Sequence, residues 1–256
     1  MDLKVKQQRF VICGASSGFG EAIARQLLSE GARVVLVARR GELLREKFSD
    51  QNVEILEGSL TDSGTIDKIV QAVEKDDFHG ILFNAGGPPP GTPLQTKMED
   101  WDAAWPLVMR WKIDLALRIA PLLVDKGYGR MLFLESQSVK QPMPSLVLSN
   151  AFRAAVVGFA KSLSLEIASK GVTVNVLAPG SHDTPAIERI IRNNSSKKDI
   201  SYEEAKKAME DNIPVGRMGQ AEELASLAAW LLSPHSGYVT GQTISHDGGS
   251  VSGIFG

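Results

Sequence analysis

A glycine-rich turn between an apolar run and a helical segment constrains the fold of this chain more than any other feature. The run at 10–13 predicts a buried strand, and Gly14, Gly18 and Gly20 follow it. Over 21–30 apolar residues return at helical spacing. Glycines permit a sharp turn and the close approach of a ligand, while free amides at a helix start attract anions. The turn therefore predicts a phosphate-binding unit, with a simple tight connection as the alternative.

Strands and helices alternate along the rest of the chain. Pro106 is expected to break or kink a long helix, and the polar segment 183–212 predicts two loosely held helices. The pattern predicts one α/β domain over 1–256, a Rossmann-type doubly wound parallel β-sheet of about seven strands flanked by helices. The predicted strands are 10–13, 33–38, 53–56, 81–83, 130–134, 172–177 and 242–245, and the other predicted helices are 41–48, 66–73, 97–126, 148–170 and 221–232.

Composition narrows the classes of partner. The 256 residues are 43% hydrophobic, enough for one sizeable core, and the formal net charge of −2 provides no basic surface for nucleic acid. Cys13 is the single cysteine, which fits a reducing compartment, and no His/Cys pair has the spacing of a metal site. The polar start and short apolar runs predict neither a signal peptide nor a membrane span. We therefore expect a cytoplasmic protein without metal, nucleic-acid or membrane partners.

Further motifs follow in a fixed order. They are Gly14-x-x-x-Gly18-x-Gly20, Asn84-Ala85-Gly86, Asn175-Val-Leu-Ala-Pro179-Gly180, and Tyr238-Val-Thr-Gly241 with Asp247-Gly-Gly. With them the chain resembles the short-chain dehydrogenase/reductase family over essentially its whole length, and within it the 3-oxoacyl-acyl-carrier-protein-reductase-like group. The resemblance implies an oxidoreductase that interconverts a carbonyl and an alcohol with a nicotinamide cofactor.

The end of the second predicted strand favours NADP(H). An NAD enzyme of this architecture has an acid there for the ribose 2′-hydroxyl, whereas this chain has Ala38 followed by Arg39 and Arg40. Arginine pairs with a phosphate through a planar fork of donors, so a 2′-phosphate explains two cations at a helix start. A solvated arginine pair balanced by Glu42 is the alternative. The acid that the family places near the adenine is Ser59 here, which leaves mainly the backbone of Leu60.

The resemblance also assigns the cofactor contacts, although it assigns no metal. They are Gly14, Ser16, Ser17, Gly18, Phe19, Gly20, Arg39, Arg40, Leu60, Asn84, Ala85, Gly86, Arg153, Pro179, Gly180 and Thr184.

The catalytic positions of the family are largely replaced. The family uses an Asn, a Ser, and a Tyr and Lys four residues apart on one helix face. The matching positions hold Val108, Ser136, Ser149 and Arg153, so only the serine is kept. A serine hydroxyl is far less acidic than a phenol, and arginine stays protonated. The usual proton transfer cannot run through Ser149 and Arg153.

Two nearby residues could supply the proton instead. Lys140 follows Ser136 in a loop predicted to face the pocket, and His182 follows Pro179-Gly180 and titrates near neutrality. A solvated loop cation and a locally hydrogen-bonded histidine are the alternatives for the two. Glu135 reads as an acid capped or ion-paired at a strand end.

Three functions stay open at this point. The first is an NADP(H)-dependent oxidoreductase with an atypical proton donor, acting on a small molecule. The second is an inactive NADP(H)-binding homologue serving as sensor or partner subunit. The third is a lyase or isomerase that uses the same pocket. In each case the segment 183–213 is expected to form a lid that sets the substrate.

One helix also predicts self-association. Ala151, Ala155, Gly158 and Ser162 fall on one stripe of the helix over 148–170 and would permit close packing. The resemblance implies a homo-oligomer, a dimer or tetramer, built on this helix. The same small residues could instead face the chain's own sheet.

Overall fold

The computed structural model contains one parallel sheet of seven strands, which confirms the predicted fold class. The structure describes residues 1–254, so 255–256 of the predicted domain lie outside the described residues. The strand order is β3-β2-β1-β4-β5-β6-β9, and every neighbouring pair is parallel. The strands are β1 (Arg9–Cys13), β2 (Arg33–Ala38), β3 (Glu54–Glu57), β4 (Gly80–Phe83), β5 (Gly129–Leu134), β6 (Val172–Pro179) and β9 (Thr243–His246).

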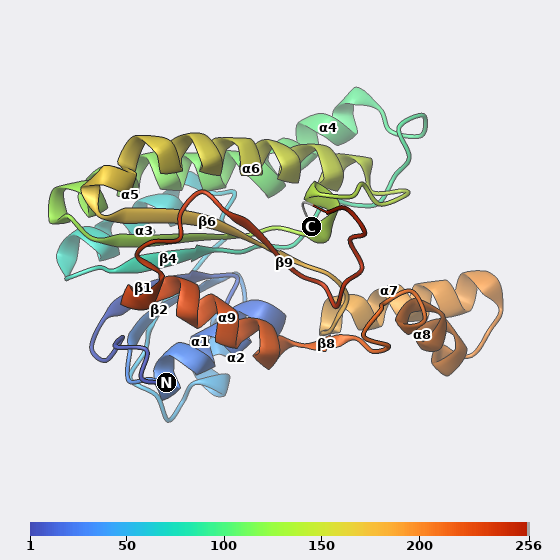
Figure 1. Ribbon diagram of the computed structural model, residues 1–256, viewed down its shortest axis with the longest axis horizontal. Helices are drawn as coiled ribbons and strands as arrows, with labels where there is room; N and C mark the ends of the chain where they lie inside the picture. Colours follow the sequence, from blue (N-terminus) through green and yellow to red (C-terminus); the bar gives the residue numbers. More distant parts are fainter. Residues whose placement is uncertain (255–256) are drawn as a thin grey trace.

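Helices cover both faces of this sheet (Figure 1). On one face α1 (Gly18–Ser29), α2 (Gly41–Lys47) and α9 (Ala221–Leu232) enclose a core with residues such as Ile12, Leu36 and Leu224. On the other face α3 (Ser63–Lys75), α5 (Trp111–Lys126) and α6 (Val147–Ile167) enclose a second core. Because both faces are buried, the strands read as continuous apolar runs. The crossover between β1 and β4 is the switch point at which such sheets bind ligands.

The break predicted at Pro106 takes the form of a π-helical turn. Helix α4 (Met98–Trp105) ends at the proline, the π-turn η1 covers Pro106–Arg110, and α5 follows directly. Proline lacks the amide that the preceding turn would use, and π-turns relieve such a defect. Beyond the turn, Trp111 and Lys112 are both buried. This placement brings a lysine into the core of the molecule.

The polar segment folds as predicted into two helices, which stand away from the sheet (Figure 1). Helices α7 (Pro185–Lys198) and α8 (Tyr202–Glu210) share a small cluster of Ile191, Ala205, Ile213 and Met218. A two-stranded pair of β7 (His182–Asp183) and β8 (Gly219–Gln220) joins the segment to the body. The short 3₁₀ helices are η2 (Gln137–Val139), η3 (Ala168–Lys170) and η4 (Pro234–Ser236).

Two predictions about surfaces can be followed further. The small residues of α6, Ala151, Ala155, Gly158 and Ser162, are exposed, so they do not face the chain's own sheet. Self-association through them stays a prediction. Within residues 1–254, no helix combines the length and the apolar character that crossing a membrane requires.

Candidate active site

The glycine-rich turn has the conformation that its spacing predicts. Gly14 and Gly18 have φ of +66° and +57°, in the left-handed region that side chains disfavour. A Cβ on Gly20 would lie 2.3 Å from the carbonyl oxygen of Gly14, so only glycine fits there. Nδ2 of Asn84 donates to the carbonyl oxygens of Cys13 and Gly14, at 3.3 and 3.4 Å. The motif after β4 thereby holds the turn after β1.

The start of α1 offers its amides to a ligand. Ser17 occupies the N-cap, yet within the described residues its side chain makes no capping hydrogen bond. The first turn of a helix has amides without internal partners and carries the positive end of the dipole. A Cβ on Gly86, in the loop after β4, would meet nothing within 4 Å. Open space therefore lies at Gly86, on the loop whose Asn84 contacts the turn.

Arg39 and Arg40 are both exposed, and the guanidinium of Arg40 reaches across to this turn. This guanidinium donates to Oγ of Ser16 at 2.9 and 3.2 Å and to Oγ of Ser17 at 2.9 Å. Lys47 brings a second cation to this turn, since its ammonium donates to the carbonyl oxygen of Ser16 at 3.3 Å. The sequence did not reveal this contact. The cations beside the predicted 2′-phosphate position therefore come from the two ends of α2.

The segment after β6 forms the opposite end of the candidate site. Pro179 ends the strand, and Thr184 caps α7 through the amide of Ile187 at 3.5 Å. Oε1 of Gln137 is buried without a hydrogen-bond partner in the described structure. A Cβ built on Gly180 would lie 2.7 Å from that oxygen. An unsatisfied acceptor is costly to bury, so it suits a site that a ligand amide fills.

His182 is held in place by both ring nitrogens. Nε2 lies 2.8 Å from Nδ1 of His246, and Nδ1 lies 3.1 Å from the carbonyl oxygen of Gly180. The ring also packs edge-on against Phe19, with 5.0 Å between centroids. Burial lowers the pKa of His182, so the imidazole is neutral at physiological pH. These contacts favour the alternative of a locally hydrogen-bonded histidine, and they connect the glycine turn to β7.

A buried ionic cluster lies where the family has its Tyr and Lys. Nη1 of Arg153 is 3.0 Å from Oε2 of Glu135 and also donates to the backbone oxygen of Glu135 at 3.2 Å. Nε of Arg153 donates to Oγ of Ser149 at 2.9 Å. Nζ of Lys112 is 2.5 Å from the other carboxylate oxygen, Oε1 of Glu135. Glu135, at the end of β5, thus joins cations from α5 and α6.

The charges of this cluster are strongly desolvated. The three side chains are buried, Lys112 at 1% exposure, Glu135 at 5% and Arg153 at 8%. Burial lowers the pKa of Lys112 to about 8, against the opposing effect of Glu135, while Arg153 lowers it further. Burial also raises the pKa of the thiol of Cys13, despite the nearby charge of Lys112. The cluster therefore carries one titratable ammonium close to neutral pH.

The remaining positions of the predicted catalytic set lie on η1 and in and around η2. Ser136 follows Glu135 and its Oγ accepts from the amide of Ser138 at 3.2 Å, which leaves its own proton for another acceptor. Lys140 directly follows η2 as its C-cap residue and is half-buried. Val108, at the position of the family's Asn, is buried in η1 at 1% exposure. The family's Asn thus has no polar substitute at that position.

Sequence reasoning missed the participation of Lys112, whereas the expected ion pairing of Glu135 at a strand end is confirmed by its contacts with Lys112 and Arg153. Lys112 lies on the same helical stripe as Leu115, Ala116 and Ile119, all of which are buried. A lysine on the apolar stripe of a helix was the available signal, because an unpaired charge in a core is costly. Its partner could not be read from the chain, since Glu135 is 23 residues away.

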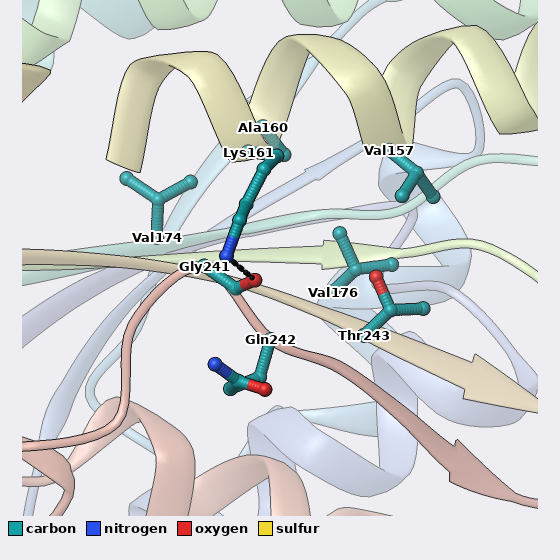
Figure 2. Close-up of a pocket in the computed structure, with 8 residues that line it drawn as sticks. All are labelled: Val157, Ala160, Lys161, Val174, Val176, Gly241, Gln242 and Thr243. Carbon is teal, nitrogen blue, oxygen red and sulfur yellow. Dashed lines mark hydrogen bonds between the residues drawn. The ribbon is translucent and has the colours of Figure 1, made fainter. Parts of the chain in front are cut away.

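Two surface hollows lie apart from this cluster. The pocket in Figure 2 lies between α6 and the edge of β6, where Nζ of Lys161 donates to the carbonyl oxygen of Gly241 at 3.0 Å. None of its lining residues is a predicted site residue. The second hollow lies between α3 and α5 and includes Leu60 together with Arg110 and Trp111. Leu60, the predicted adenine contact, therefore lines this hollow.

Comparison with known proteins places this geometry in a family. Residues 14–251 match the family model described as Enoyl-(Acyl carrier protein) reductase. The chain belongs to the short-chain dehydrogenase/reductase family. This confirms the resemblance drawn from the motifs. One similar protein is NADPH-dependent reductase BacG of Bacillus subtilis. It is 31% identical over 258 residues, which cover 97% of this chain and 99% of that protein.

Two further members of the family show the same extent of similarity. The 3-oxoacyl-[acyl-carrier-protein] reductase FabG of Rickettsia bellii is 31% identical and covers 94% of this chain and 96% of its own. A solved structure of actinorhodin polyketide ketoreductase with NADPH has a TM-score of 0.90 at 29% identity, covering 96% of this chain and 98% of its own. The predicted NADP(H) agrees with the NADPH dependence of BacG and with the NADPH in the ketoreductase structure.

Proposed function

We propose that this short-chain dehydrogenase/reductase is an NADPH-dependent reductase that converts a carbonyl of a small molecule to an alcohol. The observation that carries the proposal is the Arg153–Ser149 hydrogen bond of 2.9 Å. A fixed cation and a hydroxyl remain where the family has Lys and Tyr, and Ser136 is kept beside them. A carbonyl that accepts hydride develops negative charge on its oxygen, and hydroxyls with a nearby cation stabilise such charge.

The described residues fit the cofactor at three places. The glycine turn and the uncapped start of α1 would hold its phosphates, and Arg40, with Ser16 and Ser17, would hold a 2′-phosphate. The buried acceptor of Gln137, beside Gly180, would take a hydrogen bond from the nicotinamide amide. When bound, NADPH supplies the hydride.

The side chains of the chain then act on the substrate oxygen. Ser136 and Ser149 donate hydrogen bonds to it, since the oxygen of each accepts from a protein donor and its own proton stays available. Arg153 contributes positive potential and no proton, because a guanidinium does not lose its proton in proteins. Glu135 holds Arg153 through both its carboxylate and its backbone oxygen.

Lys140 is the residue that we propose as proton donor, ahead of His182. The buried His182 has a lowered pKa and both ring nitrogens engaged, so it holds no acidic proton at neutral pH. Lys140 lies on the same loop as Ser136, four residues later. Lys140→Gln should abolish most of the turnover, and His182→Gln should leave more of it.

Oxidation of NADPH in the presence of a panel of ketones tests the proposal directly. One mole of NADPH should be consumed for each mole of alcohol formed, and omission of the ketone should leave NADPH unchanged. Protein that binds NADPH tightly, yet oxidises none of it with any ketone, would contradict the reductase.

That result would favour the second candidate, a non-catalytic NADP(H)-binding protein. Replacement of the family's Tyr and Lys by Ser149 and Arg153 is the observation that keeps this candidate. For such a binding protein, neither wild type nor Ser136→Ala would oxidise NADPH, whereas Arg40→Asp would still weaken NADPH binding.

A further inference from the structure

Three successive polar contacts connect Lys112 to the hydroxyl of Ser149, which is proposed to donate to the substrate oxygen. Its ammonium is 2.5 Å from Oε1 of Glu135, the other carboxylate oxygen is 3.0 Å from Arg153, and Arg153 donates to Ser149 at 2.9 Å. The first contact joins α5 to the end of β5, the second joins the end of β5 to α6, and the third lies within α6. Among the residues of the reductase mechanism above, the ammonium contacts Glu135, the residue that holds Arg153.

We propose that Lys112 is a positioning residue of the reductase, which fixes Arg153 through Glu135 and makes the buried cluster net positive where the substrate oxygen gains charge. The inference rests on the proposed function. It adds a residue that has no counterpart among the family's four catalytic positions.

The fixing of Arg153 follows from how the carboxylate is shared. Lys112 engages Oε1 of Glu135, so Oε2 and the backbone oxygen remain for Arg153. A carboxylate with a single cationic partner can rotate, whereas one held on both oxygens cannot. Arg153 is thereby held in the orientation that directs Nε toward Ser149.

The net charge follows from the groups that face Lys112. They are Glu135 at the end of β5, Arg153 on α6 and Cys13 at the end of β1. The thiol of Cys13 stays protonated because burial raises its pKa. Two cations and one carboxylate leave a single positive charge, which is present only while Lys112 is protonated. In a desolvated cluster that charge is weakly screened and acts over a longer distance than it would in water.

This arrangement predicts a specific dependence of kcat on pH. The pKa of Lys112 is about 8, so its charge is present at pH 7 and is lost as the pH rises through about 8. The kcat for ketone reduction at saturating NADPH should fall through this range. The KM for NADPH should change less than kcat, because Lys112 acts on the cofactor site through Arg153, which is one of many predicted cofactor contacts.

The decisive experiment compares kcat from pH 6.5 to 9.5 for wild type, Lys112→Met and Lys126→Met, with the ketone that wild type reduces fastest. Lys112→Met keeps most of the length of the unbranched side chain and removes the charge. We expect it to lower kcat about 10-fold at pH 7, less than the roughly 10²–10³-fold of a lost direct oxyanion donor, and to abolish the decline above pH 8. Lys126→Met, the same change at the exposed end of α5, should behave as wild type.

The outcomes separate the inference from the function on which it rests. A wild-type profile that stays flat to pH 9.5, or a Lys112→Met profile that declines as wild type does, overturns the role of Lys112 and leaves the reductase intact. A wild type that reduces no ketone overturns both. Lys112→Gln serves as a second variant, and if neither variant folds, the wild-type profile alone decides.

Discussion

Arg153 and Ser149 lie one helical turn apart on α6, and Nε of the guanidinium donates to the serine hydroxyl at 2.9 Å. The direction of this bond defines what the pair can do. Because Ser149 accepts this hydrogen bond, its own proton can point to a substrate oxygen. Because Arg153 does not lose its proton, it cannot supply one to the serine. We therefore expect the pair to stabilise charge and not to perform acid catalysis. This is the physical difference from the Tyr and Lys of the family.

The two serines are therefore expected to respond differently to substitution. Ser149→Ala should lower kcat only mildly, since Arg153 still provides positive potential. Ser136→Ala should lower kcat by roughly 10²–10³-fold, the range for a lost oxyanion donor. Steady-state kinetics with a reducible ketone measures both. Loss of all turnover in Ser149→Ala, with NADPH binding unchanged, would make Ser149 the acid after all.

Cofactor preference is expected to depend on Arg40 more than on Arg39. Arg40→Asp should weaken NADPH binding by about 1–3 kcal/mol, the scale of a lost charged hydrogen bond, and Arg39→Asp by less, because it is Arg40 that is held against Ser16 and Ser17 of the glycine turn. NADH binding should hardly change. Titration by cofactor fluorescence measures these affinities. Arg45→Asp, on the same helix and paired with Glu57, is the matched control. Equal affinity of wild type for NADH and NADPH would contradict the preference.

Self-association is expected to involve the exposed face of α6. Gly158 is exposed, and a Cβ added to it would meet nothing within 4 Å, so Gly158→Trp leaves the folded chain intact. Leu165, on the same helix, is 76% exposed, which also suits a partner surface. Light scattering should show a dimer or tetramer for wild type and a smaller species for the tryptophan variant. A wild type that is monomeric at micromolar concentration would refute this prediction.

The lowered pKa of Lys112 also makes stability depend on pH. The folded-state pKa is about 8 and the ordinary value is 10.5, so between these values the unfolded chain binds more protons. The contribution of Lys112 to the free energy of unfolding therefore rises from pH 8 to 10.5 and is lost as the pH falls through this window. It amounts to about 3 kcal/mol at about 1.36 kcal/mol per pKa unit.

Denaturant unfolding of wild type and Lys112→Met at several pH values measures this contribution. The difference in unfolding free energy between the two proteins should grow in favour of wild type as the pH rises from 8 to 10. Lys126→Met controls for the charge of α5. A difference that stays constant over this range would mean that Lys112 does not titrate as described.

The sequence alone determined the fold, the glycine turn and the sites of departure from the family. These features are local: apolar runs, glycines at 14, 18 and 20, and the replacement of Tyr and Lys by Ser149 and Arg153 can be read within short windows. The alternation of strands and helices then limited the topology to one parallel sheet, because crossover connections leave few alternatives. The position of Arg40 beside the predicted phosphate site followed from the same reading.

Only the tertiary structure decided which polar groups meet. Lys112, Glu135 and Arg153 come from α5, the end of β5 and α6, and nothing in their spacing along the chain indicates that they share one desolvated cluster. The pairing of His182 with His246 likewise joins residues 64 positions apart. Burial and distance set the protonation of these groups, and both arise only when the sheet and its helices pack together.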